Sequence, residues 1–512
     1  MRKRNLVLKV LSVGCTLIVA TLILACLQRL VTPKYADGNM AEGGLIASYY
    51  DSEKNHDVIF LGDCEVYENF SPEVIERETG LKCYIRGSAQ QLIWQSYYLL
   101  EDTLRYETPK AVVFNVLSLK YDEPQNEAYN RMTLEGMEWS TAKVASINAS
   151  MTGEESFITY MFPLLRYHDR IRELNGSDLK YFFSAPKLTT DGSYLREGVV
   201  PAVSFPVGKP LESYEFGDTA WEYMEKMRLL CEEKGIKLIL IKAPSIYPYW
   251  YDEWNHIVAD YAESHGLSYI NFLSRLKRTG LSFDTDTYDG GLHLNKTGAE
   301  KLSTHFAPIL NELVTNENAV VLDRLNGHVD SNGPQVEVSE VYLPVLDETV
   351  FDPDIIDGNL HAGSEEPGEG SKTELSEEFG FMYKNFVLYP GMKWDENVAA
   401  ELGDPISYFE AKSCAFEGID RMYTYPGFEI DTSPDGTGAG SVTAVYLLDD
   451  SVTTPEGAYI GCSKSLVEKL YGDYFGPEEN SLSYEKGGTE LKFVLKDETV
   501  VSICYGLLNE NQ

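Results

Sequence analysis

The sequence predicts an α/β fold built on a parallel sheet, with a membrane-spanning helix before it and an α+β domain after it. One observation is the uncharged apolar run Val10–Leu27. A second is the alternation of apolar strands and amphipathic helices from residue 57 to 314, which is typical of a parallel sheet covered by helices on both faces. A third is the change to short β-rich stretches after an acidic segment, rich in Gly, Ser and Pro, at 351–377.

The N-terminus carries the basic residues Arg2, Lys3 and Arg4 just before the apolar run. A helix needs about 20 apolar residues to span a bilayer, and its basic flank stays in the cytoplasm. We therefore expect residues 1–35 to form a single-pass anchor in the cell membrane, with the ectodomain outside. A cleaved signal peptide is the alternative, although its apolar core normally has only about 7–15 residues. A lipoprotein signal ending at Cys26 is a third reading.

The first half of the α/β pattern contains three strands and two helices. An apolar strand at 57–61 breaks at a glycine, and a Ser-Pro pair then starts a helix at 72–79, because proline suits the first helical position. A strand at 82–86 precedes a helix at 90–105 whose apolar residues recur along one face. The stretch AVVFNVL, 111–117, is apolar almost throughout, as expected for a strand buried on both faces.

Residues 120–210 are less regular and rich in Tyr, Met and Phe, which favours an insertion or lid. The alternation then resumes with a helix that stops at a glycine, as helices commonly do. The remaining expected elements are a helix at 220–234, a strand at 236–244, a helix at 253–265, a strand at 267–272 and a helix at 296–314.

A chain of 512 residues fits several domains. After the anchor we expect the α/β domain at 36–345, an acidic flexible linker at 346–378 and the α+β domain at 379–512. In the last part, two short helices each end at a glycine and precede β-rich stretches that begin with the similar strings PISYFE and NSLSYE. This indicates a weak repeat of a helix followed by antiparallel strands.

Charge and cysteine content limit the function classes. The chain has 43 basic and 80 acidic residues and a net charge of -37, so it repels nucleic-acid phosphates and no nucleic-acid partner is expected. Eight cysteines are present without a C-x-x-C spacing, so neither a metal site nor a cofactor is expected. A disulfide between Cys64 and Cys83 is an alternative to a reactive thiol, although Cys83 should begin the second strand rather than follow it.

Two loops carry residues of chemical interest. Cys64 follows the first strand at once, on the turn where open α/β sheets place their chemistry. Its neighbour Glu65 would either repel a thiolate or face solvent. Far downstream, His293 has Asp289 and Asp286 shortly before it and a helix start shortly after it. A thiol on one loop and an Asp-His pair on another are the parts of an activated nucleophile.

Four sequence blocks resemble those of the SGNH, or GDSL, hydrolase superfamily. IFLGDCEVY resembles the first block, normally Gly-Asp-Ser, and YDGGLHLNKTGAEK resembles the last block, which carries the Asp and the His. RGSAQQ, 86–91, and VFNVL, 113–117, follow or end the second and third strands, where the family has its second and third blocks. The resemblance covers about residues 55–315 and implies the flavodoxin-like parallel sheet of that family.

The resemblance assigns a role to each matching residue. Cys64 stands where the family has its nucleophilic serine, His293 would be the base and Asp289 would orient it. The backbone amides of Cys64 and Gly87, with the side chain of Asn115, would form the oxyanion hole.

Two departures from the family pattern leave alternatives open. The family keeps its Asp three residues before the His, where this chain has Gly290, so either Asp289 or Asp286 is the carboxylate. A glycine-rich loop can absorb the extra residue. The second departure is Cys64 itself, because a thiolate is a good nucleophile and a good leaving group but could also mark a relict site.

These features predict a membrane-anchored extracellular esterase or O-acyltransferase that acts on cell-envelope polysaccharide or another acyl ester. The alternative is a non-catalytic surface protein of the same fold that binds a glycan or a protein partner. GAYIGCSKSLVEKLYG, 457–472, weakly resembles β-lactamase-inhibitor-protein-like domains, which implies a binding module with a protein partner. The aromatic string IYPYWY, 246–251, would stack on sugar rings or line the core of a loop.

Overall fold

The computed structural model divides the chain into two compact units. The first comprises Met1–Gly208, Ser213–Glu317 and Val321–Glu340, and the second comprises Lys209–Glu212, Asn318–Val320 and Val341–Gln512. The structure describes residues 2–33, 43–153, 155–172, 174–183, 187–202, 208–324, 378–384, 386–403, 405, 407–412, 419–433, 440–472, 481–496 and 498–508. The linker predicted at 346–378 lies outside the described residues except at its last position.

A five-stranded parallel sheet forms the centre of the first unit, in the order β2-β1-β3-β4-β5. This is the strand order of flavodoxin-like folds, so the predicted fold class is confirmed. Its strands are β1 (Val58–Gly62), β2 (Cys83–Gly87), β3 (Ala111–Asn115), β4 (Lys237–Lys242) and β5 (Ser268–Asn271). The apolar run expected to be a strand to residue 117 leaves the sheet at Asn115 and continues as the 3-10 helix η2 (Val116–Lys120).

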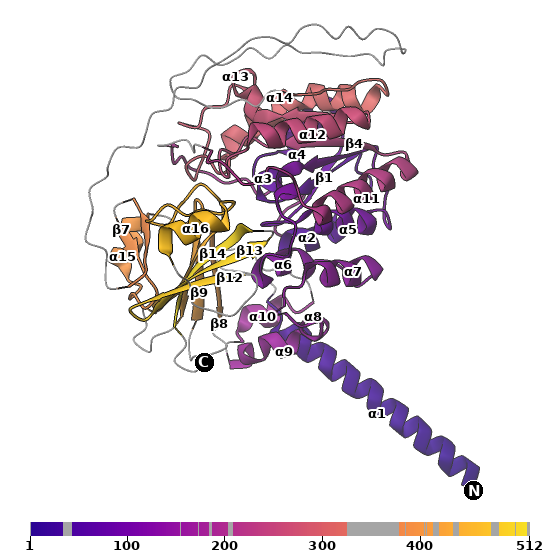
Figure 1. Ribbon diagram of the computed structural model, residues 1–512. Coiled ribbons are helices and arrows are strands. Elements are labelled where there is room, and N and C mark those ends of the chain that lie inside the picture. Colours follow the sequence, from indigo (N-terminus) through magenta and orange to yellow (C-terminus); the bar gives the residue numbers. More distant parts are fainter. Residues whose placement is uncertain are drawn as a thin grey trace, which may run out of the picture. The chain divides into compact units, whose positions relative to one another are not determined.

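Helices form layers on the sheet, as the alternating sequence pattern predicts (Figure 1). α4 packs against α14, and α5 packs against α11. The helices are α4 (Pro72–Thr79), α5 (Ile93–Thr103), α11 (Asp218–Lys234), α12 (Asp252–Ser264) and α14 (Lys296–Thr315). Two short helices, α3 (Cys64–Tyr67) and α13 (Leu276–Thr279), and the 3-10 helix η4 (Phe272–Arg275) occupy loops between them.

The irregular region predicted at 120–210 contains several short helices. α7 packs against α5, which extends the α/β unit on that side. The segment before β1 is also ordered, and it buries Leu45, Ile46 and Tyr49. These elements are α2 (Gly44–Ser48), η1 (Tyr49–Asp51), α6 (Glu127–Leu134), α7 (Thr141–Ser150), α8 (Phe157–Met161), α9 (Pro163–Tyr167), η3 (His168–Arg172) and α10 (Gly176–Lys180).

The N-terminal helix α1 spans Arg2–Val31. Its stretch Leu11–Val31 is the one among the described residues that is long and apolar enough to cross a membrane, and no residue of its most apolar window is buried. Twenty-one helical residues reach about 30 Å, the thickness of a bilayer core. A signal sequence near the N-terminus can meet the same criteria of helix length and hydropathy, so the helix is compatible with either role.

The second unit is an antiparallel α+β domain, as predicted. Its seven-stranded sheet has the order β12-β13-β14-β11-β10-β9-β8, and the strings PISYFE and NSLSYE fall at its two opposite edge strands, β8 and β12. The strands are β8 (Ser407–Lys412), β9 (Ile419–Tyr425), β10 (Phe428–Ser433), β11 (Ser441–Leu447), β12 (Ser481–Lys486), β13 (Thr489–Lys496) and β14 (Thr499–Leu507). The hairpin β6 (Phe381–Tyr383) and β7 (Phe386–Leu388) and the helices α15 (Glu396–Leu402) and α16 (Lys464–Tyr471) complete it.

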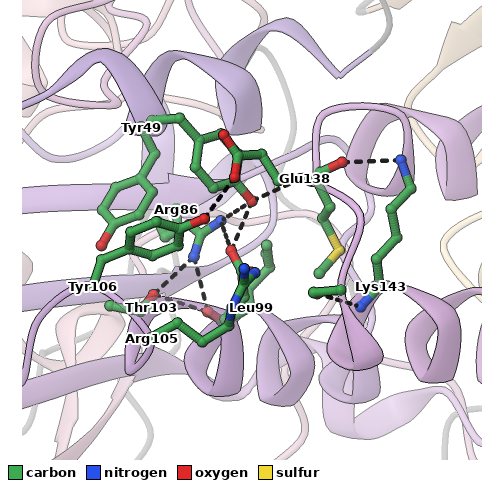
Figure 2. A network of polar contacts seen from close by, with 12 residues as sticks. Tyr49, Arg86, Leu99, Thr103, Arg105, Tyr106, Glu138 and Lys143 are labelled. Carbon is green, nitrogen blue, oxygen red and sulfur yellow. Dashed lines mark hydrogen bonds and ion pairs between the residues drawn. The ribbon is translucent and has the colours of Figure 1, made fainter.

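A buried arginine at the end of β2 connects the sheet with the helices around it (Figure 2). Arg86 has no exposed surface. Its Nη1 donates to the Leu99 carbonyl and to Thr103 Oγ1, both at 2.9 Å, and its Nη2 donates to Asp102 Oδ2 at 3.0 Å. The Tyr50 hydroxyl donates to the same carboxylate oxygen at 2.7 Å, so both charges of the pair are hydrogen-bonded.

The same guanidinium fixes the segment that enters the α/β unit. It lies 4.1 Å from the centroid of the Tyr49 ring, close enough for a cation–π contact. The Tyr49 hydroxyl donates to Glu107, which also accepts from the backbone of His56. Because Arg86 directly precedes Gly87 in the second sequence block, this network also holds the loop after β2 in place.

Removing the Arg86 charge should strongly destabilise the α/β unit. We expect Arg86→Met to lower its free energy of unfolding by about 3–5 kcal/mol, because the buried Asp102 carboxylate loses its buried cationic partner and keeps only its bonds to Tyr50 and to the exposed Arg105. The double variant Arg86→Met/Asp102→Asn should cost less than the sum of the single changes. Urea titrations of the full chain in detergent measure both effects.

Arg77→Met is the matched control, because Arg77 makes an exposed pair with Glu78. Its effect should stay within about 0.5 kcal/mol. Equal losses in Arg86→Met and Arg77→Met would contradict a structural role for the buried pair.

Candidate active site

The turn after β1 holds Cys64 at the carboxyl edge of the parallel sheet. Gly62 has a φ of +152°, and a Cβ there would lie 2.5 Å from Val66 Cγ2 and 2.9 Å from Asn115 Cβ, so the turn needs glycine. Asp63 caps α3 by accepting from the backbone N–H of Glu65 at 3.2 Å. Cys64 is therefore the first residue of a short helix, and it is partly exposed.

His293 lies on the loop before α14, where Asp289 fixes it at two points. Asp289 Oδ2 lies 2.7 Å from His293 Nδ1, and Asp289 Oδ1 accepts from the His293 backbone N–H at 2.8 Å. Gly290 and Gly291 both have positive φ, +81° and +104°, in the loop between them. The extra residue of this block is thus absorbed by left-handed backbone, and Nδ1 of the imidazole is engaged by a carboxylate.

Asp286, the other candidate carboxylate, is engaged elsewhere. Both of its oxygens lie 2.8 Å from Lys301 Nζ, and Oδ2 accepts from the Ser282 backbone at 2.9 Å. It therefore organises the loop and α14, and Asp289 is the carboxylate found at His293.

The thiol and the imidazole are close enough to change each other's pKa. Burial raises the pKa of Cys64 above its usual value, while the charge of the neighbouring His293 acts in the opposite direction. His293 Nε2 is buried, and no aligned hydrogen-bond partner for it is present in the described part of the chain.

Acidic groups surround the imidazole. Burial alone would lower the pKa of His293, but Cys64, Glu68 and Asp289 together raise it well above its usual value. The Tyr288 ring stacks on the imidazole, with 6.1 Å between ring centroids and 13° between planes, and its hydroxyl donates to Glu68. The site therefore favours imidazolium.

Asn115 does not present a free side-chain amide at the site. Its Nδ2 donates to Asp63 Oδ1 at 3.1 Å and to Glu65 Oε2 at 2.8 Å, which uses both hydrogens, and its Oδ1 accepts from Ala243 N at 3.1 Å. An oxyanion role for Asn115 would require one of these donations to break. Gly87 ends β2 and pairs with Gly62.

A buried ion pair lies beside Cys64. Lys242 Nζ donates to the two oxygens of Glu65 at 2.9 and 3.0 Å and to the Ala243 carbonyl at 2.7 Å. Lys242 has no exposed surface and Glu65 is 2% exposed. Of the two expectations for Glu65, that it repels a thiolate or that it faces solvent, the second is therefore wrong. The carboxylate is buried because an ammonium and the Asn115 amide neutralise and bond it.

Several of these residues were not singled out in the sequence. Lys242 ends the otherwise apolar run LILIK. A charged residue at the carboxyl end of a buried strand was the signal in the sequence that could have indicated a residue near the site. Glu68 and Tyr288 gave no such signal, because their contact joins loops 220 residues apart. Asn69 was also missed, and its Oδ1 accepts from the Leu294 backbone N–H at 2.7 Å, which ties the thiol loop to the histidine loop.

The remaining alternatives can be compared with the structure. Cys64 and Cys83 are both free thiols, and Cys83 begins β2, so the disulfide alternative is wrong.

Trp250 and Tyr251 are buried, at 2% and 4% exposure, so these two rings line a loop core. Among the described residues, no group of three or more His, Cys, Asp or Glu side chains has the geometry of a metal site.

Solved structures include similar proteins at low identity. They are a proposed acylhydrolase from Bacteroides fragilis NCTC 9343 (14% identity, TM-score 0.26, 51% of this chain and 90% of that chain), a proposed lipolytic protein of the G-D-S-L family from Desulfitobacterium hafniense DCB-2 (14%, 0.25, 50% and 99%) and a GDSL-like lipase from Bacteroides thetaiotaomicron VPI-5482 (12%, 0.25, 50% and 88%). No protein-family model and no curated protein matches the chain. The fold assignment therefore rests on the strand order of the chain itself.

Asp63 should make the stability of the protein depend on pH. Burial and the neighbouring Glu65 raise the pKa of Asp63 to about 7, against 3.8 for an ordinary aspartate. Between these pH values the folded state holds a proton that the unfolded state has lost, so stability falls as pH rises from about 4 to 7. The loss is on the order of 4 kcal/mol at most.

Asp63→Asn removes this titration and can keep the acceptor Oδ1. Its melting temperature relative to the wild type should rise between pH 5 and pH 8. Asp57→Asn is the control, because Lys110 and Lys82 lower the pKa of Asp57 despite its partial burial. This carboxyl is therefore ionised in both the folded and the unfolded state from pH 5 to pH 8, and the melting temperature of Asp57→Asn relative to the wild type should not change across this range. A pH-independent difference for Asp63→Asn would contradict the raised pKa.

Proposed function

We propose that the chain is an esterase or O-acyltransferase whose nucleophile is Cys64, whose base is His293 and whose orienting carboxylate is Asp289. The observation that carries the proposal is the two-point contact of Asp289 with His293, beside a thiol at the carboxyl edge of the sheet. The carboxylate sets Nδ1 as the donor to Asp289 and leaves Nε2 to exchange a proton with the thiol.

The proposed reaction proceeds through a thioester. After the imidazolium has released its Nε2 proton to solvent, His293 Nε2 takes the Cys64 proton as sulfur attacks the ester carbonyl carbon, and this proton passes to the alcohol as its C–O bond breaks. Water or a sugar hydroxyl then gives its proton to His293 Nε2 and attacks the thioester carbon, the C–S bond breaks, and the proton returns to the Cys64 sulfur, which gives hydrolysis or acyl transfer. The backbone amides of Cys64 and Gly87 are the proposed oxyanion donors, and Asn115 would join them only after releasing Asp63 or Glu65.

The site favours a protonated resting state. Because burial raises the pKa of Cys64, its thiol is neutral near pH 7, and because the Glu68 and Asp289 carboxylates raise the pKa of His293, the imidazole holds a proton there. Thiolate formation therefore requires alkaline conditions, or a substrate that moves one of the neighbouring carboxylates away from Cys64 and His293. We propose activity that increases from pH 7 to pH 9.

Location and substrate are further parts of the proposal. The apolar stretch Leu11–Val31 would anchor the chain in the cell membrane with both units outside, because Arg2, Lys3 and Arg4 precede it. Envelope polysaccharide is then the acyl-bearing polymer within reach. No cofactor is needed for this reaction.

A non-catalytic surface protein is the second candidate. Two observations favour it. The Asn115 amide is already hydrogen-bonded to Asp63 and Glu65, so it does not complete an oxyanion hole, and the pKa of Cys64 is raised, whereas the pKa of an activated thiol is lowered. In this case the α/β unit would bind a glycan, and the antiparallel unit would bind a glycan or a protein partner.

Acyl labelling distinguishes the two candidates. The full chain in detergent should gain one acyl group from p-nitrophenyl acetate at pH 8.5, detected by intact mass and mapped to Cys64. Cys64→Ala should lose the label, and Cys64→Ser should retain part of it. His293→Ala and Asp289→Asn should slow labelling by about 100-fold or more, because each removes part of the proton-transfer machinery.

Asp286→Asn is the matched control, because it changes a buried carboxylate in the same loop that contacts Lys301 rather than the imidazole. Its labelling rate should stay close to that of the wild type. If Cys64 were labelled at the same rate in His293→Ala as in the wild type, its labelling would reflect only the ordinary reactivity of an accessible thiol. That result would favour the second candidate.

A further inference from the structure

The segment 157–183 exposes apolar side chains to an unusual degree. It contains α8, α9, η3 and α10. Phe183 is 90% exposed and Leu179 is 68% exposed. Six large apolar residues of the segment are exposed in total: Ile158, Met161, Leu165, Ile171, Leu179 and Phe183. A concentration of this kind marks an interaction surface rather than the scattered exposure that is normal for soluble proteins.

This segment is attached to the end of α1. Arg170 Nη1 donates to the Val31 carbonyl at the C-terminus of α1, at 2.5 Å, and Arg29 Nε donates to the Phe182 carbonyl at 2.9 Å. α9, α10 and η3 all contact α1. Figure 1 shows α8, α9 and α10 grouped around the end of α1 that joins the α/β unit. The exposed apolar side chains thus lie where the apolar helix ends.

Internal bonds hold the segment in shape. Asp178 has no exposed surface, accepts from Arg170 Nη2 at 2.9 Å and caps α10 through the Asn175 backbone at 3.0 Å. The arginine that bonds the end of α1 is therefore itself positioned by α10. Arg166 Nη1 donates to Glu127 at 2.6 Å, which joins α9 to α6.

The charge of the segment differs from that of the chain. Residues 157–183 contain four Lys or Arg and three Asp or Glu, a net charge of +1, whereas the whole chain carries -37. Their partly exposed aromatic residues include Tyr167 and Tyr181, a residue type enriched where proteins meet the headgroup region of a bilayer. An anionic membrane surface would therefore not repel this part of an otherwise acidic protein.

We infer that the segment 157–183 is a membrane-interface collar, which inserts its exposed apolar side chains into the headgroup and acyl boundary of the bilayer around the end of α1. The occupant of this surface is lipid. The inference rests on the proposed anchoring by α1, because the membrane must end where Val31 lies. Interfacial helices usually bind a membrane by burying their apolar side chains at the boundary between headgroups and acyl chains.

The collar would add a second attachment to the single helix. A lone transmembrane helix leaves its ectodomain free to tilt and rotate. A collar bonded to that helix by Arg29 and Arg170 fixes the distance between the α/β unit and the bilayer. The site would then work at a set height above the membrane, which suits a polymer or lipid-linked substrate held at that surface.

Photocrosslinking in lipid nanodiscs tests the inference. Benzoylphenylalanine replaces one residue at a time in the full chain, and the discs contain radiolabelled phosphatidylcholine and phosphatidylglycerol. Positions 179 and 183 test the collar, and position 18, exposed on α1, tests the anchor. Position 229 on α11 is the matched control, because Leu229 is also an exposed leucine, at 49%, but lies outside the segment.

The collar predicts lipid adducts at 179 and 183 that exceed those at 229 several-fold, together with adducts at 18. Adducts at 18 alone would overturn the collar and leave the anchor standing. Their absence at 18, 179 and 183 would overturn both. Adducts of 179 or 183 with protein instead of lipid would also overturn the collar, because its occupant would then be another chain.

Discussion

The buried ion pair between Lys242 and Glu65 is the interaction on which the candidate site depends. It joins the end of β4 to the helix that begins at Cys64, and the Asn115 amide and the Ala243 carbonyl satisfy its remaining bonds. Breaking a buried pair by removing one partner typically costs about 3–5 kcal/mol, because the other charge is left uncompensated. The ends of β3 and β4 and the thiol loop are therefore held in one arrangement.

That arrangement has an electrostatic consequence for the thiol. Burial and the Asp63 and Glu68 carboxylates raise the pKa of Cys64, and the Glu68 and Asp289 carboxylates raise the pKa of His293. The thiol therefore stays protonated beside the imidazole, so in the proposed site the arrangement of the groups does not by itself activate the sulfur.

The two polar networks of the α/β unit act at neighbouring strand ends. Arg86 fixes the end of β2 and the segment that enters the unit, while Lys242 fixes the ends of β3 and β4. Each network satisfies its charges inside the protein, so neither relies on solvent. The loops that carry Cys64, Gly87 and His293 thus extend from a rigid edge, which is what a preorganised site requires.

The sequence by itself determined the elements that depend on local patterns. Strand and helix positions followed from apolar periodicity and from caps such as Ser71 and Gly235, and the four sequence blocks placed Cys64 and His293 at one edge of the sheet. Only the tertiary structure decided which carboxylate meets the imidazole, that Glu65 is buried against Lys242, and that the Asn115 amide is engaged. The physical reason is that periodicity and capping act within a few residues, whereas side-chain partners up to 225 residues apart meet only after the sheet has assembled.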